Sequence, residues 1–213
     1  MSTQLSVFNG ALRLLGEASI DDVDDTNKPA PALRDAWEDV VRYALEVHNW
    51  NFASKRAELQ RITATPAHSY DYYYAKPSDW QRTISIRDIA DDHGETIIYS
   101  VDEGGGDEYP KGLIATSVSS IFMRYISSDY MTKVGNWPET FARFVSSLLA
   151  EETCSEITGN NSKMDYIEGK IRRRKHDAIN WDAAMNQPRF TRPGRLVLSR
   201  YGASTRTQGG AQD

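Results

Sequence analysis

The chain has 213 residues, with 25 lysines and arginines against 30 aspartates and glutamates, and its net charge is near −5. This length suits one sizeable domain or one domain with an insertion, and 39% hydrophobic and 26% charged residues are typical of a soluble globular protein. No apolar run is long enough to span a membrane, and residues 1–10 lack the pattern of a signal peptide. The single cysteine, Cys154, excludes an internal disulfide and a thiolate zinc site, so we expect synthesis in a reducing cytosol.

Apolar residues at helical spacing predict two helices early in the chain, over residues 3–16 and from Pro29 or Pro31 to Asn49. From residue 55 to residue 127 the pattern changes to short apolar, β-branched and aromatic runs separated by glycine and proline turns. This change predicts a small antiparallel β module inserted between helical parts.

Four strands are expected in this module, at residues 69–75, 83–89, 96–101 and 119–126. The first contains the tyrosine cluster Tyr70–Tyr74, a composition that would also suit stacking on nucleic-acid bases. The module is rich in aspartate and glutamate, which would repel phosphate. The sequence therefore favours core packing or a protein interface for these tyrosines.

Helical spacing returns near Pro138 and predicts a third helix ending near Gly159 and a fourth from about Met164 to just before Pro188. The remaining residues are poor in apolar side chains and rich in Arg, Gly, Ser and Thr, so we expect them to be extended or disordered in the free monomer.

The sequence thus predicts a mainly α fold with a β insertion (α+β): a four-helix bundle with an inserted small antiparallel β module and an extended C-terminal tail. The expected domains are a helix bundle formed by residues 1–54 and 128–188, a β-rich insertion at 55–127, and the tail at 189–213. The expected bundle core consists of Leu12, Leu15, Trp37, Val41, Trp50, Phe52, Phe141, Phe144, Leu148, Ile167 and Ile171.

Charge is segregated along the chain. Residues 1–159 carry a net charge of −11, whereas residues 160–213 carry +6. A basic run on the fourth helix contributes Lys170, Arg172, Arg173, Arg174 and Lys175. Opposite charges favour head-to-tail self-association or binding to an acidic partner, while the alternative is a solvated basic surface and tail with no specific role.

No catalytic or metal-binding pattern emerges from the sequence. The four histidines are far apart, and the acidic loop Asp21–Asp25 lacks the glycine and the glutamate of a calcium loop. The Gly104–Gly106 run is not followed by a phosphate-loop lysine, and Cys154 has carboxylates beside it in the sequence rather than the basic groups that would activate a thiol. We therefore expect no enzymatic activity, no cofactor and no metal.

Several segments resemble a known family. They are ALRLLGEASIDDVDD at residues 11–25, HNWNFA at 48–53, WPETFARFVSSLLAEE at 137–152 and ITGN at 157–160, followed by a long final helix. In this order and spacing the chain resembles the phage head-to-tail adaptor (connector) family, which includes the tail tubular protein A of short-tailed phages. The family often has His-Pro-Trp where this chain has His48–Asn49–Trp50.

The resemblance implies a structural protein of the virion neck or tail, made in the host cytoplasm. Its partners would be the portal protein, a tail or nozzle protein and further copies of itself in a dodecameric ring, with double-stranded DNA passing through the channel without sequence-specific binding. The resemblance also implies that the tail reaches the portal. The residues then expected to contact the portal are Arg189, Arg192, Arg195, Leu196, Leu198, Arg200 and Tyr201.

Two other readings stay open at this stage. One is a tail-associated peptidoglycan hydrolase, for which the chain offers many carboxylates but no distinguishable pair. The other is a DNA-binding module that uses the basic run and the tail.

Overall fold

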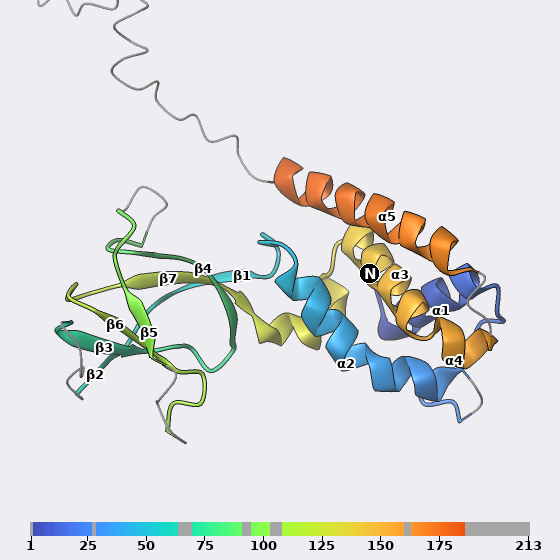
Figure 1. Cartoon of the computed structure of the whole chain (residues 1–213), viewed down its shortest axis with the longest axis horizontal. Helices are drawn as coiled ribbons and strands as arrows, with labels where there is room; N and C mark the ends of the chain where they lie inside the picture. Colours follow the sequence, from blue (N-terminus) through green and yellow to red (C-terminus); the bar gives the residue numbers. More distant parts are fainter. Residues whose placement is uncertain are drawn as a thin grey trace, which may run out of the picture.

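The computed structural model describes residues 2–26, 29–63, 70–90, 95–102, 108–159 and 163–185. Figure 1 shows helices gathered at one end of the molecule and strands at the other. The described residues are 46% helical and 20% strand, which makes the protein an α+β mixture. None of the described helices is long and apolar enough to cross a lipid bilayer.

The described residues form five α-helices: α1 (Gln4–Leu15), α2 (Ala30–Glu46), α3 (Glu139–Glu152), α4 (Cys154–Thr158) and α5 (Met164–Ala184). Local chemistry fixes the ends of α1, because the Thr3 hydroxyl caps the backbone N–H of Ser6 and Gly16 ends the helix with a left-handed φ of 73°. Two short 3₁₀ turns, η1 (Ser128–Met131) and η2 (Val134–Asn136), precede α3.

The strands of the described residues form two antiparallel sheets. The first has the order β1-β7-β4, with β1 at Ser54–Glu58, β7 at Phe122–Ser127 and β4 at Trp80–Arg87. The second has the order β2-β3-β6-β5, with β2 at Arg61–Ile62, β3 at Tyr72–Ala75, β6 at Leu113–Thr116 and β5 at Ser100–Asp102. The sheets share a buried core in which Tyr74 and Ile114 of the second meet Ile86, Met123 and Tyr125 of the first.

The expectation of a mainly α four-helix bundle with one small β module is therefore wrong. The described residues form five α-helices instead of the expected four, because the expected third helix breaks at Thr153 into α3 and α4. The Thr153 hydroxyl donates to the Leu149 carbonyl, 2.7 Å away, and the Thr153 backbone leaves helical geometry. The strands are divided between two sheets, and these sheets bury a hydrophobic core of their own. The β part therefore has its own core, as the helical part does.

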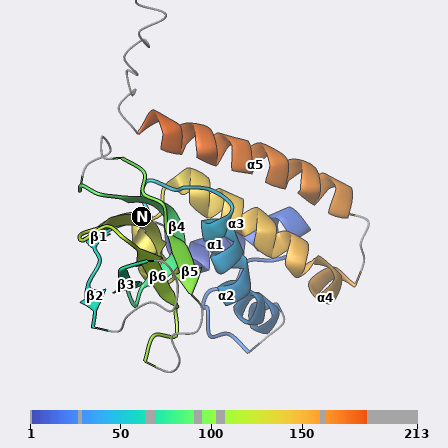
Figure 2. The ribbon, with the colours of Figure 1, turned by 60° about the vertical axis from the view of Figure 1, so that its left-hand side comes forward.

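Helix α3 lies at the centre of the helical part and packs on α1, α2 and α5. In Figure 2, α5 runs along the outside of α3. Most of the expected core residues are fully buried: Leu12, Leu15, Val41, Trp50, Phe141, Phe144 and Ile167. Leu148 is also buried, while Trp37, Phe52 and Ile171 are partly buried against the same core.

Candidate interaction surfaces

The basic run of α5 is divided between two sides of the helix. Arg172 lies beside Glu168, one turn earlier, with a nitrogen–oxygen distance of 3.3 Å. Lys170, Arg173 and Arg174 face a different groove. The α-helical repeat of 100° per residue separates these positions, so adjacent basic residues in the sequence do not share one surface.

The first surface, which we call the basic flank, is a groove of about 720 Å³ between α1, α3 and α5. It brings together five basic residues from three helices: Arg13, Arg143, Lys170, Arg173 and Arg174. Its acidic residues are Glu139 and Asp177.

Like charges crowd the basic flank. The Arg174 guanidinium donates to the Arg143 carbonyl at 2.9 Å. Burial lowers the pKa of Arg174, and the nearby charges of Arg143 and Arg13 lower it further. The flank is therefore a site where an added negative charge would be stabilising.

The second surface, the acidic flank, is a groove of about 790 Å³ between α2, α3, α4 and α5. Six carboxylates line it: Asp35, Asp39, Glu151, Glu152, Glu156 and Glu168. Arg172 is its basic residue, and apolar side chains such as Val40, Leu148 and Ile171 contribute to its lining. Burial raises the pKa of Glu151, and the charges of Glu168 and Glu152 add to that effect.

Some expected site residues lie outside the described residues. These are the tail positions Arg189, Arg192, Arg195, Leu196, Leu198, Arg200 and Tyr201. Lys175, the last residue of the basic run, lies on neither flank's lining and instead contributes a charge near His48.

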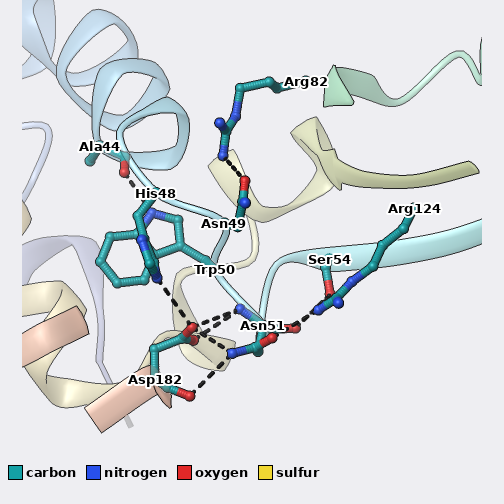
Figure 3. A network of polar contacts seen from close by, with 9 residues as sticks. All are labelled: Ala44, His48, Asn49, Trp50, Asn51, Ser54, Arg82, Arg124 and Asp182. Carbon is teal, nitrogen blue, oxygen red and sulfur yellow. Dashed lines mark hydrogen bonds and ion pairs between the residues drawn. The ribbon is translucent and has the colours of Figure 1, made fainter. Parts of the chain in front are cut away.

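A buried carboxylate joins the helical part to the first sheet (Figure 3). Asp182 of α5 is 1% exposed, and its carboxylate accepts hydrogen bonds from the Asn51 backbone N–H at 2.9 Å and from Asn51 Nδ2 at 2.7 Å. Burial raises the pKa of Asp182, which the bonds from Asn51 partly offset. His48 Nε2 is farther away, at 3.8 Å, so the asparagine rather than the imidazole satisfies this carboxylate.

The same network continues into the strands. Arg124 of β7 donates to Asn51 Oδ1 at 2.8 Å, and Arg82 of β4 donates to Asn49 Oδ1. The indole N–H of Trp50 donates to the carbonyl of Ala44 at the end of α2, 2.8 Å away. The segment between α2 and β1 is thus fastened to α5 on one side and to the sheet on the other.

The sequence did not predict a structural or functional role for Asn51 or Asp182. The only available signal was the position of Asp182, four residues after Ala178 on the buried side of the last helix. A carboxylate at such a position must be hydrogen-bonded, but the sequence alone does not show by which residue.

A second polar cluster lies where β1, β7 and η1 meet. Lys55 Nζ lies 2.6 Å from an Asp79 carboxylate oxygen and 2.9 Å from one of Asp129. Asp79 also accepts from the Tyr125 hydroxyl at 2.9 Å and from the Ser127 hydroxyl at 2.6 Å. Burial and the bond to Asp79 raise the pKa of Tyr125 to about 12, so its phenol remains a donor at neutral pH.

Hydrogen bonds and ion pairs within the two polar clusters join the first sheet to α5 and to η1, whereas the two flanks are open grooves on the helical part. Within the described ranges, no three His, Cys, Asp or Glu side chains are grouped to hold a metal ion. Neither a scan against models of known protein families nor a search of curated proteins finds a match to this chain.

Proposed function

We propose that the chain is a structural subunit of a phage neck, a head-to-tail adaptor that joins the portal to the tail and forms part of the DNA channel. The proposal is carried by one observation: two of the segments that resemble this family pack against each other. Trp50 and Phe52 of HNWNFA lie 5.0 Å and 4.9 Å, between ring centroids, from Phe141 of WPETFARF. These two segments therefore share one aromatic cluster, which supports the proposal.

The partners under this proposal are a portal protein, a tail or nozzle protein and further copies of the chain in a ring. A ring wall needs rigid subunits, and the polar clusters around Asp182 and Lys55 fasten the first sheet to α5 and to η1. The acidic residues of the chain would also let a DNA duplex slide without strong attraction to its phosphates.

Truncation tests the role of the C-terminal tail. A chain lacking residues 189–213 is expected to keep its circular-dichroism spectrum and melting temperature, because the described core lies between residues 2 and 185. It should fail to join rings of the portal protein encoded by the same phage genome, whereas the full chain should join them in negative-stain images. Normal assembly by the truncated chain would contradict tail docking, and no assembly by the full chain would contradict the adaptor role.

A peptidoglycan zymogram tests the hydrolase reading. The adaptor proposal expects no clearing by the full chain at high protein concentration. Clearing that a point substitution of one carboxylate abolishes would overturn the proposal of a purely structural protein.

The basic flank favours a second candidate function, binding to DNA. Arg13 and Arg143 join three basic residues of α5, so the fold concentrates positive charge beyond the run visible in the sequence. A gel shift of duplex DNA that weakens steeply with salt would support this function, and no shift at low salt would exclude it.

A further inference from the structure

We infer that the basic flank of one copy of this chain docks on the acidic flank of the next, forming a head-to-tail contact between copies. The inference deepens the proposed function and rests on it in one respect, namely that an adaptor ring requires a contact of this kind. The occupant of each flank is thus a second copy of the chain.

The two flanks lie on opposite sides of the α3–α5 pair. On α3, Arg143 and Ser146 line the basic flank, whereas Glu151 and Glu152 line the acidic one. At 100° per residue these two sets are about half a turn of the helix apart.

Helix α5 shows the same division. Arg173 and Asp177 lie on the basic side, while Glu168 and Arg172 lie on the acidic side. The helical repeat again places the two sets about half a turn apart. Because α3 and α5 pack together, one subunit presents one flank on each side of a shared pair of helices.

The charges of the flanks are complementary. The acidic flank has six carboxylates and one basic residue, and the basic flank has five basic residues and two carboxylates. In a single copy like charges lie close together within each flank. Burial lowers the pKa of Arg174 and raises the pKa of Glu151, and the neighbouring like charges shift both further in the same directions. A second copy that apposes the opposite flank removes both repulsions at once.

The asymmetry of the flanks selects the type of contact. The flanks lie on opposite sides of the α3–α5 pair, so a two-fold symmetric interface centred on one flank would place that flank against its own like-charged equivalent, which costs free energy. A heterologous contact pairs unlike flanks and leaves one of each free at the ends, so it repeats and closes into a ring where the rotation allows. Tyr43 beside the acidic groove is 54% exposed and offers an aromatic contact for the incoming copy.

The same basic flank would attract DNA, but the acidic flank would not, and only a second copy uses both surfaces. The observations therefore favour a protein partner. The test below distinguishes these two partners because it measures self-association in the absence of nucleic acid.

Two variants, each of which removes three charges from one flank, test the two flanks separately. The acidic-flank variant combines three substitutions of exposed carboxylates: Asp35→Asn, Glu152→Gln and Glu156→Gln. The basic-flank variant combines Arg13→Gln, Lys170→Gln and Arg173→Gln. A control with the same charge change as the acidic-flank variant substitutes exposed carboxylates among the strands: Asp71→Asn, Glu95→Gln and Glu108→Gln.

Sedimentation velocity of the full chain at low salt provides the measurement. The unmodified chain and the control are expected to form species larger than a monomer as concentration rises. Each flank variant alone is expected to associate at least about tenfold more weakly, because three exposed ion pairs are removed. Circular-dichroism melting verifies that every variant is folded.

Mixing the two flank variants is decisive. Each retains one intact flank, so an equimolar mixture should form a one-to-one dimer that grows no further. A mixture that behaves like the separate variants, or an unmodified chain that stays monomeric under all these conditions, overturns the inference. Self-association that the acidic-flank substitutions leave unchanged overturns it as well.

Failure of the inference is distinguishable from failure of the proposed function. Flank-dependent association without capture by portal rings upholds the inference and contradicts the adaptor role. Capture by portal rings that is unaffected in both flank variants, together with a monomeric free chain, overturns the inference alone.

Discussion

Lys55 and its two carboxylate partners, Asp79 and Asp129, form a cluster in which all three pKa values are shifted. Hydrogen bonds from Lys133 and Lys55 lower the pKa of Asp129 to about 2. Burial raises the pKa of Asp79, but bonds from Lys55, Ser127 and Tyr125 outweigh it and lower that pKa below its ordinary value. Both carboxylates therefore stabilise the fold above their ordinary pKa of 3.8, and this stabilisation is lost as the pH falls toward 2.

Replacing Lys55 by glutamine tests this cluster. The pKa of Lys55 is raised above 10.5, so its own contribution is complete at neutral pH and is lost only above pH 10.5. We expect Lys55→Gln to lower the free energy of unfolding at pH 7, and the difference from the unmodified chain to shrink between pH 3.8 and about 2. Urea denaturation across this range gives the values, with exposed Lys111→Gln as a control, and an unchanged difference at pH 2 would contradict the assignment.

Two glycines should respond to alanine with opposite signs. Gly16 has a φ of +73°, where an L-residue costs about 1–2 kcal/mol, so Gly16→Ala should destabilise the protein. Gly169 lies within α5, and a Cβ there would meet nothing within 4 Å, so Gly169→Ala should stabilise the helix by about 0.5–1 kcal/mol. Thermal denaturation of the two variants is the measurement, and shifts of the same sign would contradict one of the two conformations.

At the scale of elements, the long amphipathic helices were the part that sequence periodicity predicted. The expected helices at 3–16 and 29–49 correspond to α1 and α2 within a few residues. The break at Thr153 was missed because apolar spacing continues across it, and only a hydrogen bond from a buried hydroxyl marks it. Periodicity reports which side of a helix is buried, but not whether the backbone is continuous.

Strands were harder to predict. The strand β1 has the sequence SKRAE, whose charged residues hide its alternation, and β6 is buried at all four positions and shows no alternation at all. Both were missed, although β6 pairs with two neighbouring strands at the centre of its sheet. A strand that is covered on both sides loses the period-two signal that sequence analysis depends on.

The packing of α2 on α3 is open to a direct test. Phe144 is 1% exposed in the core, so Phe144→Ala should destabilise the protein by about 3–5 kcal/mol. Trp37 is only partly buried, where it stacks on Trp137 at 5.7 Å, so Trp37→Ala should cost less. Tyr43 is 54% exposed on the same helix as Trp37, so Tyr43→Ala should change the free energy of unfolding by no more than about 0.5 kcal/mol. Chemical denaturation gives the three values, and equal losses of stability at all three positions would contradict this core.

At the scale of the whole molecule, the division of charge along the sequence is not the division in space. The sequence separates an acidic part before residue 160 from a basic part after it. Folding brings Arg13 and Arg143, from the acidic part, to the basic flank, and Glu168, from the basic part, to the acidic flank. The sequence thus indicated one acidic and one basic surface, but which residues line each surface depends on which helices pack together.

Because the two flanks are charged and the core is apolar, salt concentration should affect self-association much more than folding. The Debye length falls from about 10 Å at 0.1 M salt to about 3 Å at 1 M, so contacts between exposed charged flanks weaken strongly. The described core is apolar and should be little affected, because its buried residues interact without charge. We expect self-association of the unmodified chain, measured by sedimentation, to weaken about tenfold or more over this range, while the melting temperature by circular dichroism changes little. The acidic-flank variant, associating weakly throughout, should lose most of this salt dependence. Association that strengthens with salt would instead indicate an apolar contact, and would remove the flanks as the basis of assembly.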